Sequence, residues 1–105
     1  MVPGMNTLVA LADPRRRAIL DVLRGGEHAV NDLVGTLGLT QPEVSKHLRA
    51  LRQAELVKVR IAGPWRFYRL APEPLRELDA WLAPYRELWQ RSLDRLERHL
   101  DELPE

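Results

Sequence analysis

The chain has 105 residues, of which 45% are hydrophobic and 30% charged, and its formal net charge is +1. This length predicts one domain that buries roughly 65% of its unfolded surface, a modest core that a second copy could enlarge. Without cysteine it has no disulfide framework or thiolate metal site, and with no apolar run near the ~18 residues of a membrane span it is expected to be cytoplasmic.

Two helices are predicted in the first 26 residues. Residues 7–12 are apolar and short, and they fit the end of a first helix. Asp13-Pro14 predicts the start of the next one, because aspartate caps a helix and proline fits its first position without losing a needed donor. That helix is expected to end at Gly25-Gly26. Arg15, Arg16 and Arg17 lie in its first turns, where they either contact phosphate or form a solvated face.

Residues 31–55 predict two helices joined by a tight turn, and a short extended strand is expected just before them, at 27–30. Asn31 can cap the first helix, and Gly38 stands where a left-handed C-terminal cap belongs. Thr40 and Glu43 form a capping box, which starts the second helix. A glycine turn followed by a short, polar, basic helix is the layout of a helix-turn-helix, whose second helix enters the DNA major groove.

The second helix of this motif divides its side chains between core and solvent. Val44, Leu48 and Leu51 recur at the spacing of a buried face, so the polar side chains between them face outward. Glutamine can pair with adenine and serine with base or phosphate, whereas lysine and arginine supply affinity through phosphate. The predicted DNA-binding residues of the motif are Thr40, Gln41, Ser45, Lys46, His47, Arg49 and Arg52. For His47, a partly buried packing role is the alternative.

Residues 56–70 predict a β-hairpin. Residues 56–61 alternate apolar and basic side chains, 62–64 form a turn, and 65–70 make a second strand rich in aromatic residues. A hairpin directly after a helix-turn-helix is a wing, whose basic side chains can reach the DNA backbone or the minor groove. Arg60 and Arg66 are therefore predicted DNA-binding residues as well. Trp65 and Phe67 could stack on bases, but we expect them to pack in the core or within the wing.

Positive charge is concentrated in this central part of the chain. Residues 40–71 carry seven basic and two acidic side chains, a net charge of +5. Residues 1–39 are neutral and residues 72–105 have a net charge of −4. A phosphate-binding surface requires such a concentration, although a basic solvated surface would have the same composition.

Residues 73–103 predict a long C-terminal helix. Pro74 suits its first turn, and Pro84 should kink or restart it by removing a backbone hydrogen bond. Its leucine and aromatic side chains recur every three or four residues and offer more apolar surface than one small domain covers. The helix either packs on its own core or divides its surface between its own domain and the same helix of a second subunit, which we favour. The predicted dimerisation residues are Leu8, Leu78, Leu82, Tyr85, Trp89, Leu93, Leu96 and Leu100.

These segments together resemble a known family. LADPRRRAILDVL, DLVGTLGLTQPEVSKHLRAL, LVKVR and the pattern G-x-x-x-x-YRL at 63–70 are similar to the ArsR/SmtB family of bacterial winged-helix repressors, and Q-P-x-V-S-x-H-L at 41–48 is the most specific part. The fold expected is mainly α with a small β-hairpin: a single winged helix-turn-helix domain over 1–105, with reading motif 31–55, wing 56–70 and dimerisation helix 73–103. The resemblance implies a homodimer, joined through its first and last helices, that binds an inverted repeat near a promoter and blocks transcription.

Two positions depart from the family pattern. Glu55 stands where the family usually has the glycine that ends the reading helix, which predicts a different exit from that helix. The wing tip is Pro64-Trp65, where relatives often carry arginine, and this weakens the case for insertion of the tip into the minor groove.

Metal ions are the best-known signal of this family, but the residues favour no metal site and no other cofactor. Ala29 and Asn31 occupy the positions of the thiolate ligands, and neither is a soft ligand. His99-x-x-Glu102 matches half of the C-terminal-helix type of site, with no Asp-x-His upstream. The chain therefore resembles a metal-independent branch, and its inducer is unknown.

Two other function classes compete with a DNA-binding repressor. An enzyme is not expected, since no nucleophile, base and orienting group converge in the sequence. A winged-helix module for protein contact, without DNA readout, is the second class, and the net charge of residues 40–71 argues against it. The predicted partners are therefore double-stranded DNA and a second copy of the chain, and no membrane.

Overall fold

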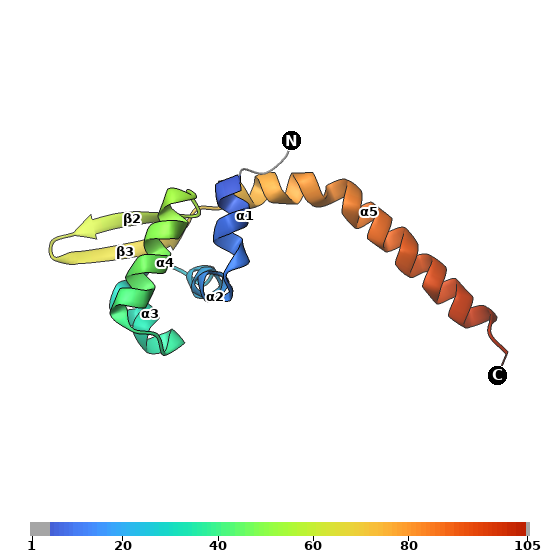
Figure 1. The fold of residues 1–105 in the computed structure, drawn as a ribbon, viewed down its shortest axis with the longest axis horizontal. Coiled ribbons are helices and arrows are strands. Elements are labelled where there is room, and N and C mark those ends of the chain that lie inside the picture. Colours follow the sequence, from blue (N-terminus) through green and yellow to red (C-terminus); the bar gives the residue numbers. More distant parts are fainter. Residues whose placement is uncertain (1–4, 105) are drawn as a thin grey trace.

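The computed structural model describes residues 5–104 as a winged helix-turn-helix with a long C-terminal helix (Figure 1). The elements, in chain order, are α1 (Met5–Ala12), α2 (Pro14–Leu23), β1 (His28–Ala29), α3 (Val30–Leu37), α4 (Gln41–Gln53), β2 (Val57–Ala62), β3 (Trp65–Leu70) and α5 (Glu73–Glu102). The mainly α fold class predicted from the sequence is confirmed. Within the described part of the chain, no helix combines the length and apolarity that crossing a membrane requires.

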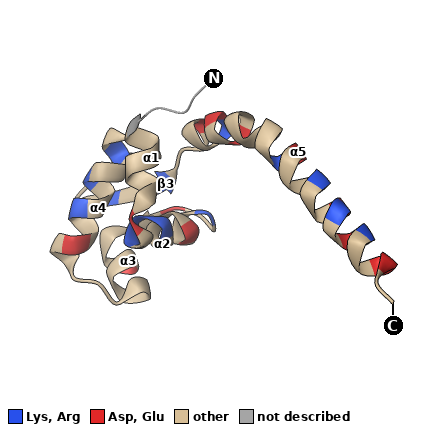
Figure 2. Cartoon of the chain, turned by 45° about the vertical axis from the view of Figure 1, so that its right-hand side comes forward, with Lys and Arg blue, Asp and Glu red and all other residues tan. Residues whose placement is uncertain are grey.

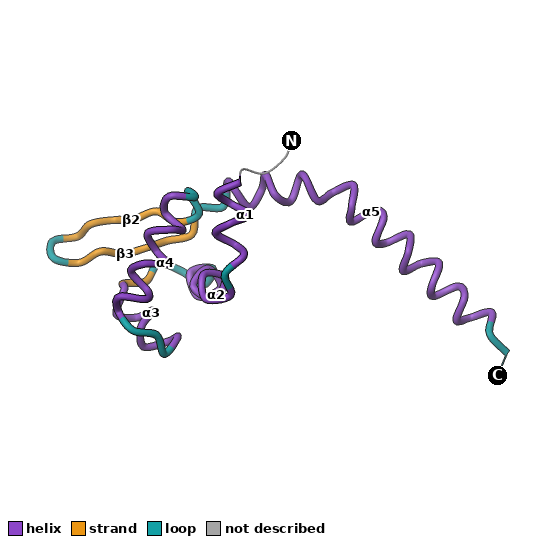
Figure 3. The backbone as a smooth tube through the Cα atoms, in the orientation of Figure 1, coloured by secondary structure: helices purple, strands orange, loops and turns teal. Residues whose placement is uncertain are grey.

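The three strands form one antiparallel sheet in the order β1-β3-β2. β2 and β3 pair from Val57 opposite Leu70 to Ala62 opposite Trp65, so the predicted hairpin is confirmed. Its turn needs the left-handed conformation that Gly63 adopts, at φ 59°. β1 pairs with the other edge of β3, as expected of a strand at 27–30. Figure 3 shows the hairpin projecting beside α4, away from α1 and α2.

A core of aliphatic side chains fixes the helix-turn-helix to the base of the hairpin. Burial of each such side chain stabilises the fold by about 1.5–3 kcal/mol, which makes this cluster the main source of rigidity. Its fully buried members come from α2, α3, α4 and the segment before β2, and they are Ile19, Leu33, Val44, Leu48, Leu51 and Leu56. α4 is therefore held along its inner side, with its outer side free.

Capping side chains set where the helices begin. Asp13 starts α2 by accepting a hydrogen bond from the Arg15 amide at 2.7 Å. The predicted capping box starts α4: the Thr40 amide donates to Glu43 at 2.9 Å, and the Glu43 amide donates back to Thr40 Oγ1 at 3.3 Å. The hydrogen bond from the Thr40 amide also holds the pKa of the Glu43 carboxyl below its usual value.

The start of α3 differs from the prediction. Asn31 lies inside the helix, which begins at Val30 with Ala29 as the capping residue. Alanine has no side-chain acceptor, so Asp32 compensates by accepting from the Ala29 amide at 3.3 Å. The helix starts early because Ala29 is already extended in β1, and the chain must turn directly from strand into helix.

The exit from α4 also differs from the prediction. Glu55 adopts the left-handed conformation, φ 61°, that the family usually gives to glycine. Its amide donates to Arg52 at 3.0 Å, and the next amide, of Leu56, donates to Leu51 at 2.9 Å, which together make a Schellman motif. The exit is therefore the ordinary one, and the expectation of a different exit is wrong. The buried Leu51 and Leu56 hold the turn in place despite the strain at Glu55.

α5 is one continuous helix that leaves the domain. Pro84 lies inside it, so of the two predicted outcomes, a kink or a restart, the restart does not occur, and Figure 1 shows a change of direction in the first half of the helix. Only its start packs on the core, through the buried Pro74 and the partly buried Leu75. The Cα radius of gyration is 18.7 Å, against about 13 Å for a compact chain of this length, because the rest of α5 projects outward. Packing of the helix along its own domain is thus confined to its first turns.

Replacing Glu55 with glycine should stabilise the protein. A left-handed non-glycine residue costs about 1–2 kcal/mol, and the greater freedom of glycine in the unfolded chain takes back about 0.5–1 kcal/mol. Chemical denaturation should therefore show a gain of about 0.5–1 kcal/mol for Glu55→Gly. Glu55→Ala is the matched control, because it removes the carboxylate but keeps the strained β-carbon. An equal gain in both variants would place the cost in the charge instead of the backbone.

Candidate nucleic-acid interface

The outer side of α4 is polar, basic and exposed. Each turn of the helix adds a cation to this side, and Figure 2 shows Lys and Arg recurring along α4 while its acidic residue lies at one end. The exposed side chains, in order along the helix, are Gln41, Ser45, Lys46, Arg49 and Arg52, and Thr40 is exposed just before its start. The three cations make no ion pair with a described carboxylate. The helix thus offers uncompensated positive charge on one face.

His47 lies on the other side of α4, which corrects its predicted role. Its side chain is buried, with 5% of the residue exposed. Its Nδ1 accepts a hydrogen bond at 3.3 Å from Nε of Arg16, on α2. A side chain enclosed between two helices cannot reach a nucleic acid, so the prediction of DNA contact is wrong for His47. Periodicity could not settle the choice, because the position borders both faces of the helix.

The three arginines at the start of α2 all bond within the chain. Arg15 lies 3.7 Å from the Glu43 carboxylate, which ties α2 to the first turn of α4. Arg16 donates to His47, and Arg17 donates from Nη1 to the carbonyl oxygens of Leu11 at 2.7 Å and Ala12 at 3.1 Å. Arg15 and Arg17 nevertheless stay exposed, so the choice between phosphate contact and a solvated face stays open for them. Their hydrogen bonds position the helices, and those of Arg17 also satisfy carbonyl groups that have no helical partner at the end of α1.

The register of the hairpin places the two predicted wing arginines on opposite faces. Arg60 pairs with Phe67, and Arg66 pairs with Ile61. Because neighbours along a strand alternate, Arg66 shares a face with the buried Tyr68, whereas Arg60 shares the other face with Trp65. Arg66 is exposed because it lies beyond the helices, near the turn. The sequence alone left this register open.

Arg60 is exposed, but its guanidinium is paired within the chain. Its Nη2 lies 2.5 Å and its Nε 3.1 Å from Oε1 of Glu27, and its guanidinium lies 4.7 Å from the centre of the Phe67 ring. The hydrogen bond from Arg60 lowers the pKa of the Glu27 carboxyl, and the carboxylate in turn raises the pKa of Arg60. This clamp of Glu27, Arg60 and Phe67 links β1 to both strands of the wing. Arg60 therefore holds the wing, and its charge is already balanced.

Two further cations of the wing are not among the DNA-binding residues that the sequence predicts. Lys58 and Arg69 are directly opposite each other in the β2–β3 pairing, on the face that also bears Trp65. Like charges in that arrangement repel, so a nearby anion would relieve them. The alternation of residues 56–61 marked Lys58 as outward, but only the pairing brings it beside Arg69.

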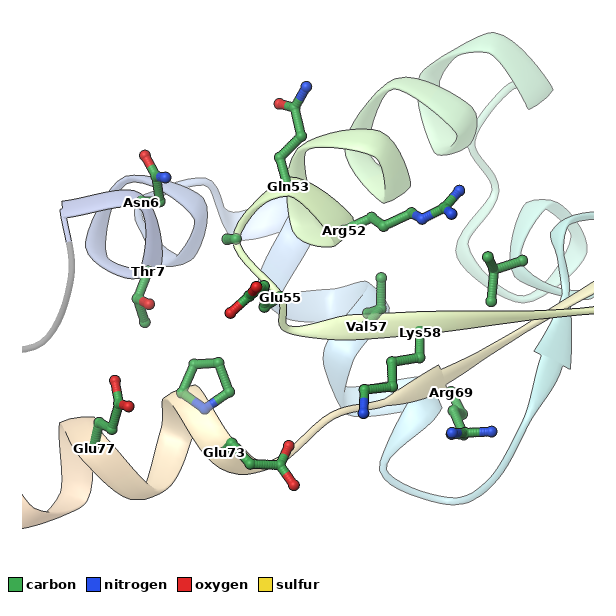
Figure 4. A pocket seen from close by; sticks show the side chains of 13 residues that line it. Asn6, Thr7, Arg52, Gln53, Glu55, Val57, Lys58, Arg69, Glu73 and Glu77 are labelled. Carbon is green, nitrogen blue, oxygen red and sulfur yellow. The ribbon is translucent and has the colours of Figure 1, made fainter.

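A cleft of about 980 Å³ adjoins this pair, between α1, the end of α4, the wing and the start of α5. Figure 4 shows Lys58 and Arg69 on one side of it and Glu73 and Glu77, from α5, on the other. Arg52 lines it as well. The cleft thus links the last turn of α4 to the base of α5.

A comparison with known protein families decides the assignment. Residues 13–59 match the model of the family described as "Bacterial regulatory protein, arsR family". The transcriptional repressor SdpR of Bacillus subtilis is 34% identical over 77 residues, which cover 73% of this chain and 86% of that protein. The regulator Rv2034 of Mycobacterium tuberculosis is 43% identical over 84 residues, 80% of this chain and 76% of the relative. The chain belongs to the ArsR family. It is a DNA-binding transcriptional regulator.

Solved structures of other ArsR proteins share the fold. The ArsR family regulator RHA00566 superimposes with a TM-score of 0.71 and 33% identity, over 81% of this chain and 88% of that one. The homodimeric winged helix-turn-helix DNA-binding domain Mb0332 from Mycobacterium bovis gives a TM-score of 0.64 and 34% identity, over 78% of this chain and 76% of that one.

Metal ligands do not gather in the part of this ArsR protein that the structure describes. No three His, Asp or Glu side chains come together there in an arrangement that could hold an ion. His99 and Glu102 lie on the projecting half of α5.

The Glu27–Arg60 contact makes a pH-dependent prediction. The pKa of Glu27 lies below its ordinary value of 4.5 in the folded protein, so the contact stabilises the wing above that pH. The contribution is lost as the pH falls through the lowered pKa. Carbon-13 NMR titration should show the depressed pKa of Glu27, and Arg60→Gln should return it toward the ordinary value. An unchanged pKa in that variant would assign the shift to another charge.

Proposed function

We propose that this ArsR-family protein is a homodimeric repressor that binds an inverted repeat in double-stranded DNA near a promoter, in the cytoplasm. One observation carries the proposal: α4 is anchored by its inner side and exposes cations that the described chain leaves unpaired. Packing alone would not require such a face, and the repulsion within it is relieved by phosphate. The reading motif, wing and C-terminal helix then act as parts of one domain.

The exposed side chains divide into two roles. Gln41 and Ser45, in the first turns of α4, reach base edges or the adjacent phosphate. The cations farther along, Lys46, Arg49 and Arg52, contact phosphate and supply affinity without sequence information. Thr40 caps the helix first and donates to phosphate second. On the wing, exposed Arg66 is a phosphate contact, whereas Arg60 serves to hold the hairpin in position.

Salt-dependent binding separates the two roles. Arg49→Ala should weaken binding to every duplex, and it should reduce the slope of log affinity against log salt by about 0.9 per lost phosphate contact. Gln41→Ala should keep the slope and narrow the difference in affinity between selected and random duplexes. Fluorescence anisotropy with labelled 30-bp duplexes at several salt concentrations measures both quantities.

Arg24→Ala is the matched control for this titration, since Arg24 is exposed at the end of α2, outside the reading motif. Its slope should match that of the unmodified protein. A slope that does not change in Arg49→Ala either would remove α4 from the phosphate contacts and favour a protein-contact module.

The apolar side of α5 supports the dimer. From Tyr85 onward, α5 and its C-cap residue bear large apolar side chains, each 45–59% exposed, at Tyr85, Leu88, Trp89, Leu93, Leu96, Leu100 and Leu103. So much apolar surface on a helix that leaves its own domain requires a partner. Exposed Leu8 and Val9 add an apolar patch on α1. We assign a second copy as the partner, because the related domain Mb0332 is homodimeric and a two-fold dimer would present two reading helices to a palindromic site.

Charge introduced into this apolar side should separate the subunits. Leu96→Glu places a carboxylate where two helices meet, so light scattering after size exclusion should report a monomer at micromolar concentration. Arg98→Glu is the control, since it changes charge on the opposite side of α5 and should leave the dimer intact. A dimeric Leu96→Glu variant would exclude this face as the subunit contact.

A further inference from the structure

The tip of the wing is apolar and open to solvent. Trp65 is 56% exposed and Ile61 is 68% exposed, on opposite faces of the hairpin, and Pro64 is exposed between them. Of the two packing roles expected of Trp65, in the core or within the wing, the core role is therefore wrong. Phe67, two residues farther along, does pack, beneath Arg60. An indole that stays outside the fold, so close to an aromatic residue that packs, has another use.

The surroundings of the tip favour a polyanion. Residues 56–72 contain no aspartate or glutamate, and they contribute three arginines and a lysine. Arg66 is exposed beside Trp65 in sequence, while Lys58 and Arg69 lie on the same face of the hairpin as the indole. An apolar tip with cations behind it suits a ligand that has both an apolar surface and regularly spaced negative charge. Duplex DNA offers both, in its sugar walls and its phosphates.

The position and rigidity of the wing indicate that the polyanion at its tip is the duplex that α4 binds. The tip and α5 lie at opposite ends of the molecule in Figure 1, so a dimer formed through α5 leaves the tip free. β2 begins four residues after α4 ends, which places the hairpin beside the reading helix. The clamp of Glu27, Arg60 and Phe67 and the pairing with β1 then hold the hairpin in one orientation. A fixed tip next to the reading helix continues the same interface.

We propose that Trp65 is a DNA contact whose indole packs in the minor groove beside the half-site that α4 reads, with Arg66 on the adjoining phosphate. This inference rests on the proposed function. Apolar side chains serve as wedges in minor grooves elsewhere, where they favour easily deformed, A·T-rich steps. Trp65 thus takes the place of the arginine that relatives often carry at the tip, and it adds a preference for the sequence that flanks the half-site.

The test compares Trp65→Ala and Trp65→Gln with Trp65→Phe. The probe is a 40-bp duplex that the full-length protein has selected from a random library. Loss of the indole should weaken binding on the order of tenfold without changing the salt slope, because no charge is removed. Trp65→Phe should bind within about twofold of the unmodified protein. Arg66→Ala should instead reduce the slope, as a lost phosphate contact does.

A pair of duplexes that differ only beside the half-site tests whether Trp65 binds in the minor groove. Replacing A·T with G·C pairs beside the half-site puts amino groups in the minor groove, which should weaken binding of the unmodified protein but not of Trp65→Ala. Equal affinities of Trp65→Ala, Trp65→Gln and the unmodified protein for the selected duplex would overturn the inference and leave the proposed function standing. The inference would also be overturned if Trp65→Ala lost the dimer. The same holds if Trp65 were needed for binding to anionic lipid vesicles but not for binding to duplexes. Failure of the unmodified protein to bind any duplex would refute the proposed function instead.

Discussion

Burial of one side of α4 is the constraint on which the rest of this structure depends. Val44, Leu48 and Leu51 are sealed in the core, so the helix cannot rotate without exposing them to water at a cost of about 1.5–3 kcal/mol each. The Thr40–Glu43 box fixes where the helix begins. The Schellman motif at Glu55 fixes where it ends, and it does so with a residue that disfavours the required conformation. The polar side chains of α4 point outward as a consequence.

The fold separates cations that build the protein from cations left for a partner. Arg15, Arg16 and Arg17 bond to Glu43, to His47 and to carbonyl oxygens at the end of α1, and Arg60 bonds to Glu27. These interactions tie α2 to α4 and the wing to β1. The cations of α4 have no such internal partners among the described residues. Net charge could not show this division, because an internally paired arginine and a free one count equally.

The projection of α5 explains how a small domain can assemble. The core needs only the start of this helix, and the remaining turns carry apolar side chains away from it. Three pairs of them, Leu82 with Leu93, Tyr85 with Leu96 and Trp89 with Leu100, are eleven residues apart. A period of eleven alone gives a right-handed supercoil and a period of seven a left-handed one, and the stripe has both, since Leu82, Trp89 and Leu96 are seven residues apart. The stripe on α5 therefore suits long, nearly straight contact with another helix.

The sequence by itself determined the elements of this protein and the inner side of α4, because helix caps, turn glycines and apolar spacing act between residues that are near in the chain. It also located the wing and the concentration of charge. Only the tertiary structure decided where individual side chains lie and what they bind. His47 is buried and hydrogen-bonded to Arg16, and Arg60 is paired with Glu27. Trp65 is exposed to solvent, and Glu55 adopts a strained left-handed conformation. Each outcome depends on partners from distant segments or on strand register, and neither is encoded by local periodicity.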